Sequence, residues 1–284
     1  MPRAASADLN ALDALPTIVF LHGTRLTGAQ WAVQVTALEG EFRCLAPDLL
    51  GHGLAASEPF TLADAAAAVA ETIEAEANGP AIIVGLSLGG YVAMEVAARW
   101  PERVAGLVLA GASAEPVGLR APAFRALAWV FETLDERWLR RLNVWFFRWR
   151  YRPAIAEPII AGGFHFRGGA VAVRSLVGEH FRPRLARFPG PALILNGEFD
   201  LLFRLYQRSF VGAASDARAS VIPWATHLTN LDRPEVFTAA VRRFARDCRA
   251  NGMTDAAHEN GPTKVASYTR PTDSTRLPRF DARP

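Results

Sequence analysis

Six short runs of apolar residues divide the chain, and each run ends in residues that favour turns. The runs lie at 16–23, 42–48, 81–87, 104–112, 191–200 and 219–227. Unbroken hydrophobicity over about four to eight residues is typical of strands that are covered on both faces. Between the runs, apolar residues recur at helical spacing over 28–38, 60–77, 88–99, 202–213 and 234–249. This alternation predicts an α/β fold, with a mostly parallel sheet of about six strands flanked by helices.

Residues 115–187 interrupt the alternation, because they contain no convincing strand. Helical spacing over 124–150 aligns large apolar side chains on one stripe, namely Leu127, Phe131, Leu134, Trp138, Leu142, Trp145 and Trp149. The arginines and tryptophans of this segment would suit a helix that lies on a membrane surface. An amphipathic helix more often packs such a stripe against a protein core, and we favour this second interpretation. We therefore expect 115–187 to be a helical insertion between two strands of the sheet.

The two ends of the chain lack both patterns. Residues 1–15 form an N-terminal extension, in which Asp8, Asn10 and Asp13 interrupt any apolar stretch, and residues 251–284 are polar without periodicity. We expect neither a signal peptide nor a membrane-spanning helix, and hence a cytoplasmic protein. The C-terminal tail is expected to be disordered. The predicted units between the two ends are a core formed by 16–114 and 188–250, and the insertion at 115–187.

Charge is unevenly distributed along the chain. Half of the 284 residues are hydrophobic and 21% are charged, which is an ordinary globular composition, and the net charge of +3 is too small to indicate nucleic-acid binding. Residues 115–187, however, contain 13 arginines and only six acidic residues. Such an excess concentrates ligands of opposite charge, so it suits a small-molecule substrate that is anionic or linked to an acidic carrier. A solvated arginine-rich face is the more common origin of such a run.

No cofactor is indicated by the sequence. Cys44 and Cys248 have neither the spacing of a metal site nor that of a disulfide framework. The chain also lacks a G-x-G-x-x-G motif, a phosphate-binding P-loop and zinc-type spacing of Cys and His. We expect an activity that needs no metal or organic cofactor, and partners that include neither nucleic acid nor a membrane. The oligomeric state is not indicated.

A G-x-S-x-G motif occupies residues 85–89, with Ser87 at its centre. Such a short motif also occurs by chance, in which case Ser87 would be an ordinary turn residue. Here an apolar run precedes the motif and a helical pattern follows it, which is the strand–turn–helix context of a nucleophilic serine. Glycine on both sides permits the sharp turn that this context requires. We therefore interpret Ser87 as a candidate nucleophile.

A serine hydroxyl is a weak nucleophile unless a base accepts its proton. His227 is the candidate base, because it closes the last apolar run and completes the chain order Ser…Asp…His with Ser87 and Asp200. Asp200, at the end of the fifth run, would orient the imidazole. Glu198 and Glu115 compete for that role, and Asp200 could instead cap the following helix. The remaining histidines lie in turns, in the insertion or in the tail: His22, His52, His165, His180 and His258.

Further candidates surround this centre. The backbone N–H groups of Thr24, in the turn after the first run, and of Leu88, at the start of a helix, could together stabilise an oxyanion. Arg25 is a candidate for contact with a substrate carboxylate, because a guanidinium group binds carboxylate bidentately. Three residues of the insertion are candidates for the pocket wall, although core packing accounts for the two aromatic rings equally well: Phe164, His165 and Phe166.

Five stretches of the chain, in this order and spacing, resemble the α/β-hydrolase fold family: HGTR, PDLLGHG, GLSLGG, NGEFD and HLTNLDRPEVF. The resemblance covers about residues 16–248, and within the family it is greatest to small bacterial carboxylic-ester and enol-lactone hydrolases. The resemblance implies that Ser87 is the nucleophile, His227 the base and Asp200 the acid of a catalytic triad.

The same resemblance implies an oxyanion hole formed by Thr24 and Leu88, and it makes the insertion at 115–187 a cap domain over the active site. Family members usually have two further strands before the HG strand. Only residues 1–15 precede that strand here, so we expect a shortened sheet of six strands. Leu228 follows the candidate base, where relatives that cleave carbon–carbon bonds commonly carry Trp.

Together these features predict a serine hydrolase that cleaves a carboxylic ester, thioester or lactone through an acyl-enzyme on Ser87. One fold supports many reactions, so carbon–carbon bond cleavage, cyclisation or acyl transfer in secondary metabolism is an alternative. A second alternative is a non-catalytic protein that binds a ligand in the same pocket. The complete set of triad candidates argues against it.

Overall fold

The computed structural model describes residues 15–255 of the chain, and the side chains of residues 15–250. Within this range six parallel strands form one sheet in the order β2-β1-β3-β4-β5-β6. The strands are β1 Thr17–Leu21, β2 Arg43–Leu45, β3 Ala81–Leu86, β4 Val104–Ala110, β5 Pro191–Gly197 and β6 Asp216–Ile222. The predicted α/β class and the six-stranded parallel sheet are thus confirmed.

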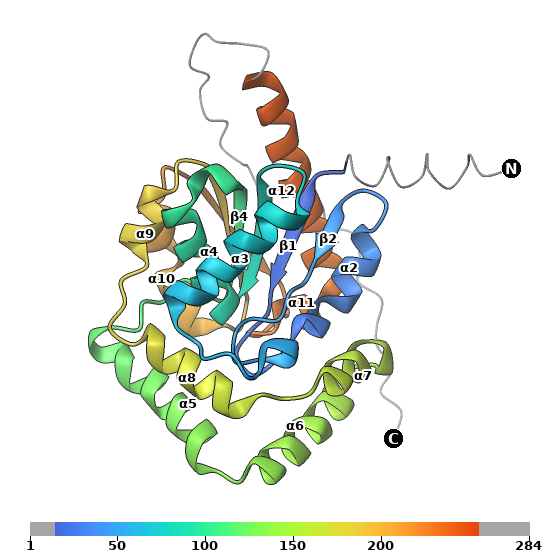
Figure 1. Cartoon of the computed structure of the whole chain (residues 1–284), viewed down its shortest axis with the longest axis vertical. Helices are drawn as coiled ribbons and strands as arrows, with labels where there is room; N and C mark the ends of the chain where they lie inside the picture. The colour runs from blue at the N-terminus through green and yellow to red at the C-terminus, as the bar shows by residue number, and fades with distance from the viewer. Residues whose placement is uncertain (1–14, 256–284) are drawn as a thin grey trace, which may run out of the picture.

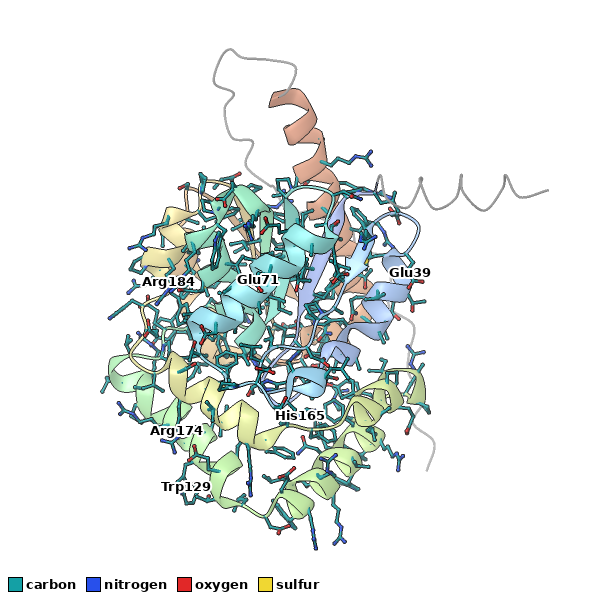
Figure 2. The ribbon with its side chains drawn as sticks, in the orientation of Figure 1. Glu39, Glu71, Trp129, His165, Arg174 and Arg184 are labelled. Atoms are coloured by element: carbon teal, nitrogen blue, oxygen red, sulfur yellow. The ribbon has the colours of Figure 1, made fainter. Side chains whose placement is uncertain are left out.

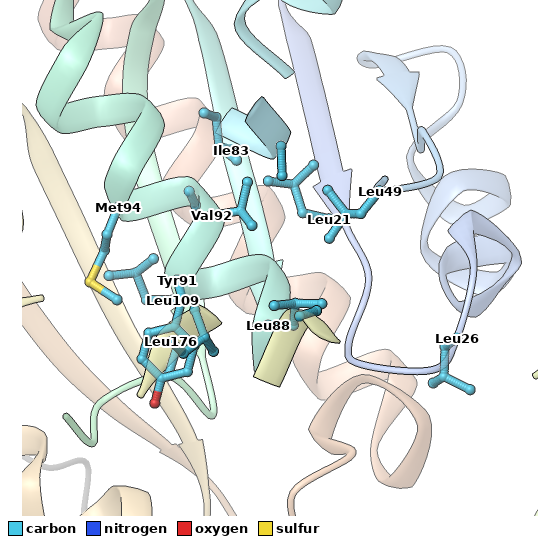
Figure 3. Close-up of a cluster of buried hydrophobic side chains, with 14 of the residues drawn as sticks. Leu21, Leu26, Leu49, Ile83, Leu88, Tyr91, Val92, Met94, Leu109 and Leu176 are labelled. Atoms are coloured by element: carbon cyan, nitrogen blue, oxygen red, sulfur yellow. The ribbon is translucent and has the colours of Figure 1, made fainter. Parts of the chain in front are cut away.

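Helices cover both faces of the sheet (Figure 1). They are α2 Ala32–Leu38, α3 Leu62–Glu76, α4 Leu88–Arg99, α10 Leu201–Val211 and α12 Pro234–Asp255, and the short helix α11 Thr229–Asp232 precedes α12. Alternate residues along each strand face opposite sides, so Ile83 of β3 packs with α3 and α4 while Ile82 and Val84 pack with α2 and α12. Figure 3 shows this packing on the α4 side, where Val92 lies close to Ile83. The two apolar clusters fix α4 on the sheet, and α4 begins directly after Ser87.

Two boundaries differ from the sequence-based expectation. The last strand, expected over 219–227, is β6 at Asp216–Ile222, and the chain turns at Trp224, which has a positive φ of 58°. β6 is an edge strand with mostly exposed residues, so hydrophobicity does not mark its start. The last helix, α12, runs to Asp255, beyond the expected end at 249. The predictions for residues 1–14 and 256–284 lie outside the described residues.

The segment between β4 and β5 is helical, as the sequence predicts. It contains α5 Ala121–Thr133, α6 Glu136–Arg150, α7 Pro153–Gly162, α8 Phe166–Leu176 and α9 Arg182–Arg187. Figure 1 shows α5, α6, α7 and α8 grouped beyond one end of the sheet. The turn after β1 contacts this group, because the Thr24 hydroxyl donates to the carbonyl of Gly169 and the N–H of His165 donates to the carbonyl of Arg25. The helices therefore lie over the carboxyl ends of the strands.

The prediction of one helix over 124–150 with a buried stripe is wrong. The chain leaves α5 at Thr133, and α6 starts anew at Glu136, where the Asp135 carboxylate caps the helix by accepting from the N–H of Trp138 at 2.8 Å. The break rotates the second half, so that α6 packs inward through Leu139 and Phe147. Of the predicted stripe only Phe131 is buried, and the other members are exposed: Leu127, Leu134, Trp138, Leu142, Trp145 and Trp149.

No helix among the residues described is both long and apolar enough to cross a membrane.

Candidate active site

Ser87 occupies the turn between β3 and α4. Its backbone has φ 54° and ψ −115°, a left-handed conformation that costs free energy for a residue with a side chain. The N–H of Ser87 donates to the carbonyl of Ala110 at the end of β4, at 2.8 Å. The strained turn is therefore fixed to the neighbouring strand, and it places Ser87 on the wall of a pocket.

The glycines of the motif allow the strand and the helix to approach closely. A Cβ atom on Gly85 would lie 2.4 Å from the carbonyl carbon of Gly89, and one on Gly89 would lie 2.1 Å from the carbonyl oxygen of Leu21. Both separations are shorter than any van der Waals contact, so a larger residue would force α4 away from β1 and β3. The turn around Ser87 depends on both glycines.

His227 and Asp200 come together at the same end of the sheet. The Nδ1 atom of His227 lies 2.9 Å from Oδ2 of Asp200, and the ring of Phe203 stacks on the imidazole at 4.9 Å. Asp200 follows β5 at the start of α10, but its side chain makes no capping hydrogen bond there. The Asp200 carboxylate therefore contacts His227 and does not cap α10. With the carboxylate accepting from Nδ1–H, the Nε2 atom is left as the proton acceptor.

The two competing carboxylates are engaged elsewhere. Oε2 of Glu198 accepts from the N–H of Trp224 at 2.9 Å. The buried side chain of Glu115 accepts from the N–H groups of Phe181 and Arg182 at the start of α9, and from the Arg182 guanidinium. Neither makes a hydrogen bond with a histidine nitrogen at the candidate site.

Gly111, which follows β4, is a site residue that no sequence motif indicates. Its φ is +55°, and a Cβ atom there would lie 2.7 Å from Cε1 of His227 and 3.3 Å from Oδ2 of Asp200. The N–H of Gly111 donates to Oδ1 of the buried Asn196 at 3.1 Å. The His227–Asp200 pair therefore packs directly against the backbone of Gly111. A glycine after a strand is the only signal that the sequence contains for this role.

Asp232, for which no role is predicted from the sequence, connects the His227 loop to the helical insertion. Its buried carboxylate accepts from the N–H of Thr226 at 2.7 Å and from the Thr226 hydroxyl at 2.6 Å. It also accepts from the Tyr151 hydroxyl at 2.9 Å and pairs with Arg150 at 2.9 Å. Since Thr226 directly precedes His227, Asp232 joins the candidate base to the end of α6.

Thr24 and Leu88, the candidates for an oxyanion hole, line the same pocket as Ser87. Within the described part of the chain, neither of their N–H groups donates a hydrogen bond to a protein acceptor. Leu88 is the first residue of α4, whose N-terminal N–H groups have no partner within the helix and carry partial positive charge. Two unpaired donors beside a serine can bind a developing oxyanion.

The pocket that contains these residues has a volume of about 260 Å³. Apart from Ser87, Asp200 and His227, its wall consists of Thr24, Leu88, Tyr91, Ala123, Phe124, Leu127, Val173, Leu176, Leu202 and Phe203. Tyr91 is buried, and its hydroxyl donates to the carbonyl of Ala114. Among the described residues, no lysine or arginine lines this pocket. Most of the wall is therefore apolar, and helices α5 and α8 of the insertion contribute part of it.

The candidate substrate contacts in the insertion do not line this pocket. Phe164 and Phe166 are buried, and their rings pack on those of Phe147 and Phe131, respectively. They form the core of the insertion, so the alternative of core packing holds for both rings. His165 packs on His52 at 6.2 Å, also away from the pocket.

Arg25 is likewise not a pocket residue. It has a positive φ of 60°, its Nε–H donates to Oδ1 of Asn143 at 3.0 Å, and its guanidinium lies over the ring of Phe131. Burial lowers the pKa of Arg25 to about 10. The Arg25 side chain therefore lies between the β1 turn and helices α5 and α6, and the contact with a substrate carboxylate stays a prediction.

Two buried histidines support the turn that carries Thr24. Nε2 of His22 accepts from the N–H of Leu49 at 2.9 Å, and Nε2 of His52 accepts from the N–H of Arg25 at 3.2 Å. Burial lowers the pKa of His22 to about 3 and that of His52 to about 4. Both imidazoles are therefore neutral near pH 7 and act as hydrogen-bond acceptors for the backbone.

The part of the chain that the structure describes contains no group of three or more His, Cys, Asp or Glu side chains arranged to hold a metal ion.

A model of the alpha/beta hydrolase family matches residues 18–240. The chain belongs to the α/β-hydrolase family. This α/β hydrolase is 30% identical over 251 residues to the pimeloyl-[acyl-carrier protein] methyl ester esterase of Edwardsiella ictaluri, covering 80% of this chain and 92% of the relative. It is 25% identical over 255 residues to the 3-oxoadipate enol-lactonase 1 of Acinetobacter baylyi, covering 86% and 94% of the two chains.

Among solved structures, the α/β hydrolase is similar to a thermophilic esterase from Thermogutta terrifontis. The TM-score is 0.69 at 26% identity, with 83% of this chain and 90% of the other covered. The resemblance to bacterial ester and enol-lactone hydrolases that the sequence motifs indicate is thus confirmed.

Proposed function

We propose that this α/β hydrolase is a serine hydrolase that cleaves a carboxylic ester, thioester or lactone through an acyl-enzyme on Ser87. The observation that carries the proposal is the 2.9 Å contact between Nδ1 of His227 and Oδ2 of Asp200, on the wall of the pocket that also contains Ser87. A carboxylate in this position fixes the tautomer in which Nε2 can accept a proton. Relatives named as esterase and enol-lactonase add support for ester chemistry.

In the acylation step, His227 removes the proton from Ser87 while the serine Oγ attacks the carbonyl carbon of the substrate. Negative charge develops on the carbonyl oxygen, and the N–H groups of Thr24 and Leu88 stabilise it. Loss of one such donor typically lowers turnover by about 10²–10³. The imidazolium then donates its proton to the departing alcohol or thiol as the bond to the acyl carbon breaks. The acyl group remains on Ser87.

In the deacylation step, His227 takes a proton from water, and the resulting hydroxide attacks the acyl carbon. The same two N–H groups stabilise the second tetrahedral intermediate. The proton returns from His227 to the serine oxygen, the carboxylic acid leaves and free Ser87 is restored. Asp200 remains ionised in both steps and stabilises the imidazolium.

The pocket wall supports an uncharged, apolar group beside the ester carbonyl. Phe124, Leu127, Val173 and Leu176 supply apolar surface, and a substrate carboxylate beside them would be buried without a cationic partner among the described lining residues. A volume of about 260 Å³ suits a short acyl or alcohol group rather than a bulky one. A carrier-linked ester, such as the name of the Edwardsiella relative describes, would react by the same steps if its acyl end is apolar.

The test measures hydrolysis of p-nitrophenyl acetate, butyrate and octanoate through the release of p-nitrophenolate. The anionic ester p-nitrophenyl hemisuccinate is measured in the same way for comparison. We expect turnover of the neutral short esters, and kcat/KM roughly tenfold or more lower for the anionic ester because the pocket offers it no cation. Ser87→Ala should lower kcat by at least about 10³-fold. Full activity of Ser87→Ala would overturn the mechanism, and equal kcat/KM for the anionic ester would overturn the assignment of the pocket.

Incubation of the same esters with an added alcohol or amine acceptor separates hydrolysis from acyl transfer. Formation of the free acid as the main product supports the hydrolase. If transfer products dominate at low acceptor concentration, the proposed water step is wrong, although Ser87 would retain its role as nucleophile.

A further inference from the structure

The outer face of α6 is aromatic and exposed. Trp138, Leu142, Trp145 and Trp149 recur at helical spacing on the side opposite to the buried Leu139 and Phe147. Trp149 has 68% of its surface exposed, and its ring stacks on that of Trp145 with an interplanar angle of 4°. Figure 1 shows α6 at the outer edge of the molecule, on the far side of α8 from the sheet.

A second helix of the insertion also has an exposed tryptophan. Trp129 of α5 is exposed, and Figure 2 shows it on the outer side of α5. Tryptophan side chains are mostly buried in soluble domains, because their large apolar area is unfavourable in water. Three exposed indoles in line on one helix, with a fourth on the next, therefore indicate a surface that another apolar phase covers.

The helix that carries this face is also rich in positive charge. The helix has five arginines and one acidic residue, Glu136. Three of these arginines pair with carboxylates: Arg140 with Glu136, Arg148 with Glu157 and Arg150 with Asp232. Arg137 and Arg141 are exposed, and no carboxylate of the described residues pairs with either. Arg141 and Trp145 also line a shallow, largely apolar groove of about 620 Å³ along the helix.

We propose that the α6 face, defined as Arg137, Trp138, Arg141, Leu142, Trp145 and Trp149, binds the surface of an anionic lipid bilayer. Indole rings favour the boundary between headgroups and acyl chains, since the ring is apolar and its N–H remains hydrated or bonded to a headgroup. Unpaired arginines beside them are attracted to anionic headgroups. A helix with aromatic residues on its exposed face and arginines along it is the arrangement of interfacial membrane helices.

The lipid surface fits this face better than a protein partner does. The side chains lie along a single helix, and apart from the arginines they offer few polar groups for the rim of hydrogen bonds that surrounds a protein interface. Binding to a bilayer surface does not require such a rim of hydrogen bonds. The helix break at Asp135 leaves most of the apolar stripe exposed, which suits a membrane-surface helix better than a stripe packed against a protein core.

Binding at the α6 face does not depend on the proposed function, because none of the residues that line the pocket belongs to α6. The test is co-sedimentation of the full chain with vesicles of phosphatidylcholine alone, and of equal parts phosphatidylcholine and phosphatidylglycerol. It measures lipid binding without any substrate, so its outcome is independent of hydrolysis.

Two double variants and two matched controls make the test specific. Arg137→Glu/Arg141→Glu should weaken binding to the anionic vesicles roughly 30-fold, and Trp145→Ala/Trp149→Ala should weaken it at least roughly tenfold. Trp224→Ala removes an indole that is equally exposed, at 68%, but lies outside α6. Arg187→Glu/Arg208→Glu reverses two exposed arginines on α9 and α10. Both controls should bind like the unmodified chain.

The expected result is binding to anionic vesicles that is at least tenfold tighter than to neutral ones and that weakens with added salt, as electrostatic attraction requires. Absence of binding to anionic vesicles, or binding that the two α6 variants do not weaken, would overturn the proposal. If light scattering shows a dimer that Trp145→Ala/Trp149→Ala dissociates, without vesicle binding, the face joins two copies of this chain and the membrane proposal is wrong.

Discussion

Ser87, Asp200 and His227 come from three separate loops, and residues without chemistry of their own hold them in place. Gly111 supports the imidazole, Phe203 stacks on it, and Asn196 accepts from the N–H of Gly111. The G-x-S-x-G motif made Ser87 predictable from the sequence, and chain order did the same for His227. Gly111 was not predictable, because its role depends on a contact with a loop more than a hundred residues later.

Gly111→Ala should inactivate the enzyme without unfolding it. The added methyl group would lie 2.7 Å from Cε1 of His227 and would displace the imidazole. We expect kcat to fall about 100-fold or more, since displacement by about 1 Å has costs of this order. Gly118→Ala is the matched control, because Gly118 has nearly the same φ, +56°, and nothing within 4 Å of the added atom. Similar kinetics for the two variants would contradict the assigned contact.

Asp200→Asn tests which carboxylate orients the base. The amide has nearly the shape of the carboxylate but can neither stabilise the imidazolium nor fix the tautomer, so kcat should fall about 10⁴-fold. Glu198→Gln should change kcat less than about threefold, because the amide oxygen can still accept from the N–H of Trp224. A larger loss in Glu198→Gln than in Asp200→Asn would reverse the assignment.

At the scale of helices and strands, the sequence predicts buried strands well, but it predicts the edge strand and the helix break in the insertion poorly. Apolar runs predicted five of the six strands to within a few residues, since buried parallel strands are uniformly hydrophobic. The edge strand β6 carries no such signal. In the sequence, the helical spacing of apolar residues runs through Leu134 and Asp135 without a gap. In the structure, Asp135 is the N-cap of α6, so one helix ends before it and another begins after it. Periodicity identified an amphipathic segment but not the direction in which its two halves face.

Asp232→Asn should destabilise the junction. It removes the charge that pairs with Arg150 and weakens the hydrogen bonds with Thr226 and Tyr151. We expect the free energy of unfolding to fall by about 2–3 kcal/mol, because Asp232 has a buried side chain. Asp247→Asn, which breaks a half-exposed pair with Arg218, should cost less than about 1 kcal/mol. Chemical denaturation measures both, and equal losses would show that Asp232 is not a structural link.

For the molecule as a whole, the carboxyl ends of the strands are where buried polar groups gather. His22 and His52 lie there under the insertion, in neutral form, and accept backbone hydrogen bonds. The sequence placed both in turns but could not reveal their burial, because burial depends on contacts between segments far apart in the chain, such as that of His52 with His165. The arginine-rich composition of the insertion was likewise visible in the sequence, whereas its position on an outer face was not.

The burial of these histidines makes the molecule sensitive to acid. Their pKa values are about 3 and about 4 in the folded state, below the ordinary value of 6.5, so the unfolded chain binds more protons below pH 6.5. The contribution of the two neutral histidines to the free energy of unfolding is therefore fully present above pH 6.5. It is lost as pH falls toward 4, by about 1.4 kcal/mol per pH unit for each histidine.

His52→Gln should reduce this dependence. Between pH 7 and pH 4.5 the variant should lose roughly 2–3 kcal/mol less unfolding free energy than the unmodified chain. His180→Gln, at an exposed position, serves as the control. Urea denaturation at the two pH values measures the difference, and parallel losses in all three proteins would contradict the assignment.

The central claim, that Ser87 is an activated nucleophile, is tested most directly by covalent labelling with a fluorophosphonate probe, followed by peptide mass analysis. Our account predicts a label on Ser87 that is absent in Ser87→Ala and strongly slowed in Asp200→Asn, because the probe reacts only with a serine whose proton a neighbouring base accepts. A folded chain that remains unlabelled, or that carries the label on another residue, would contradict the account.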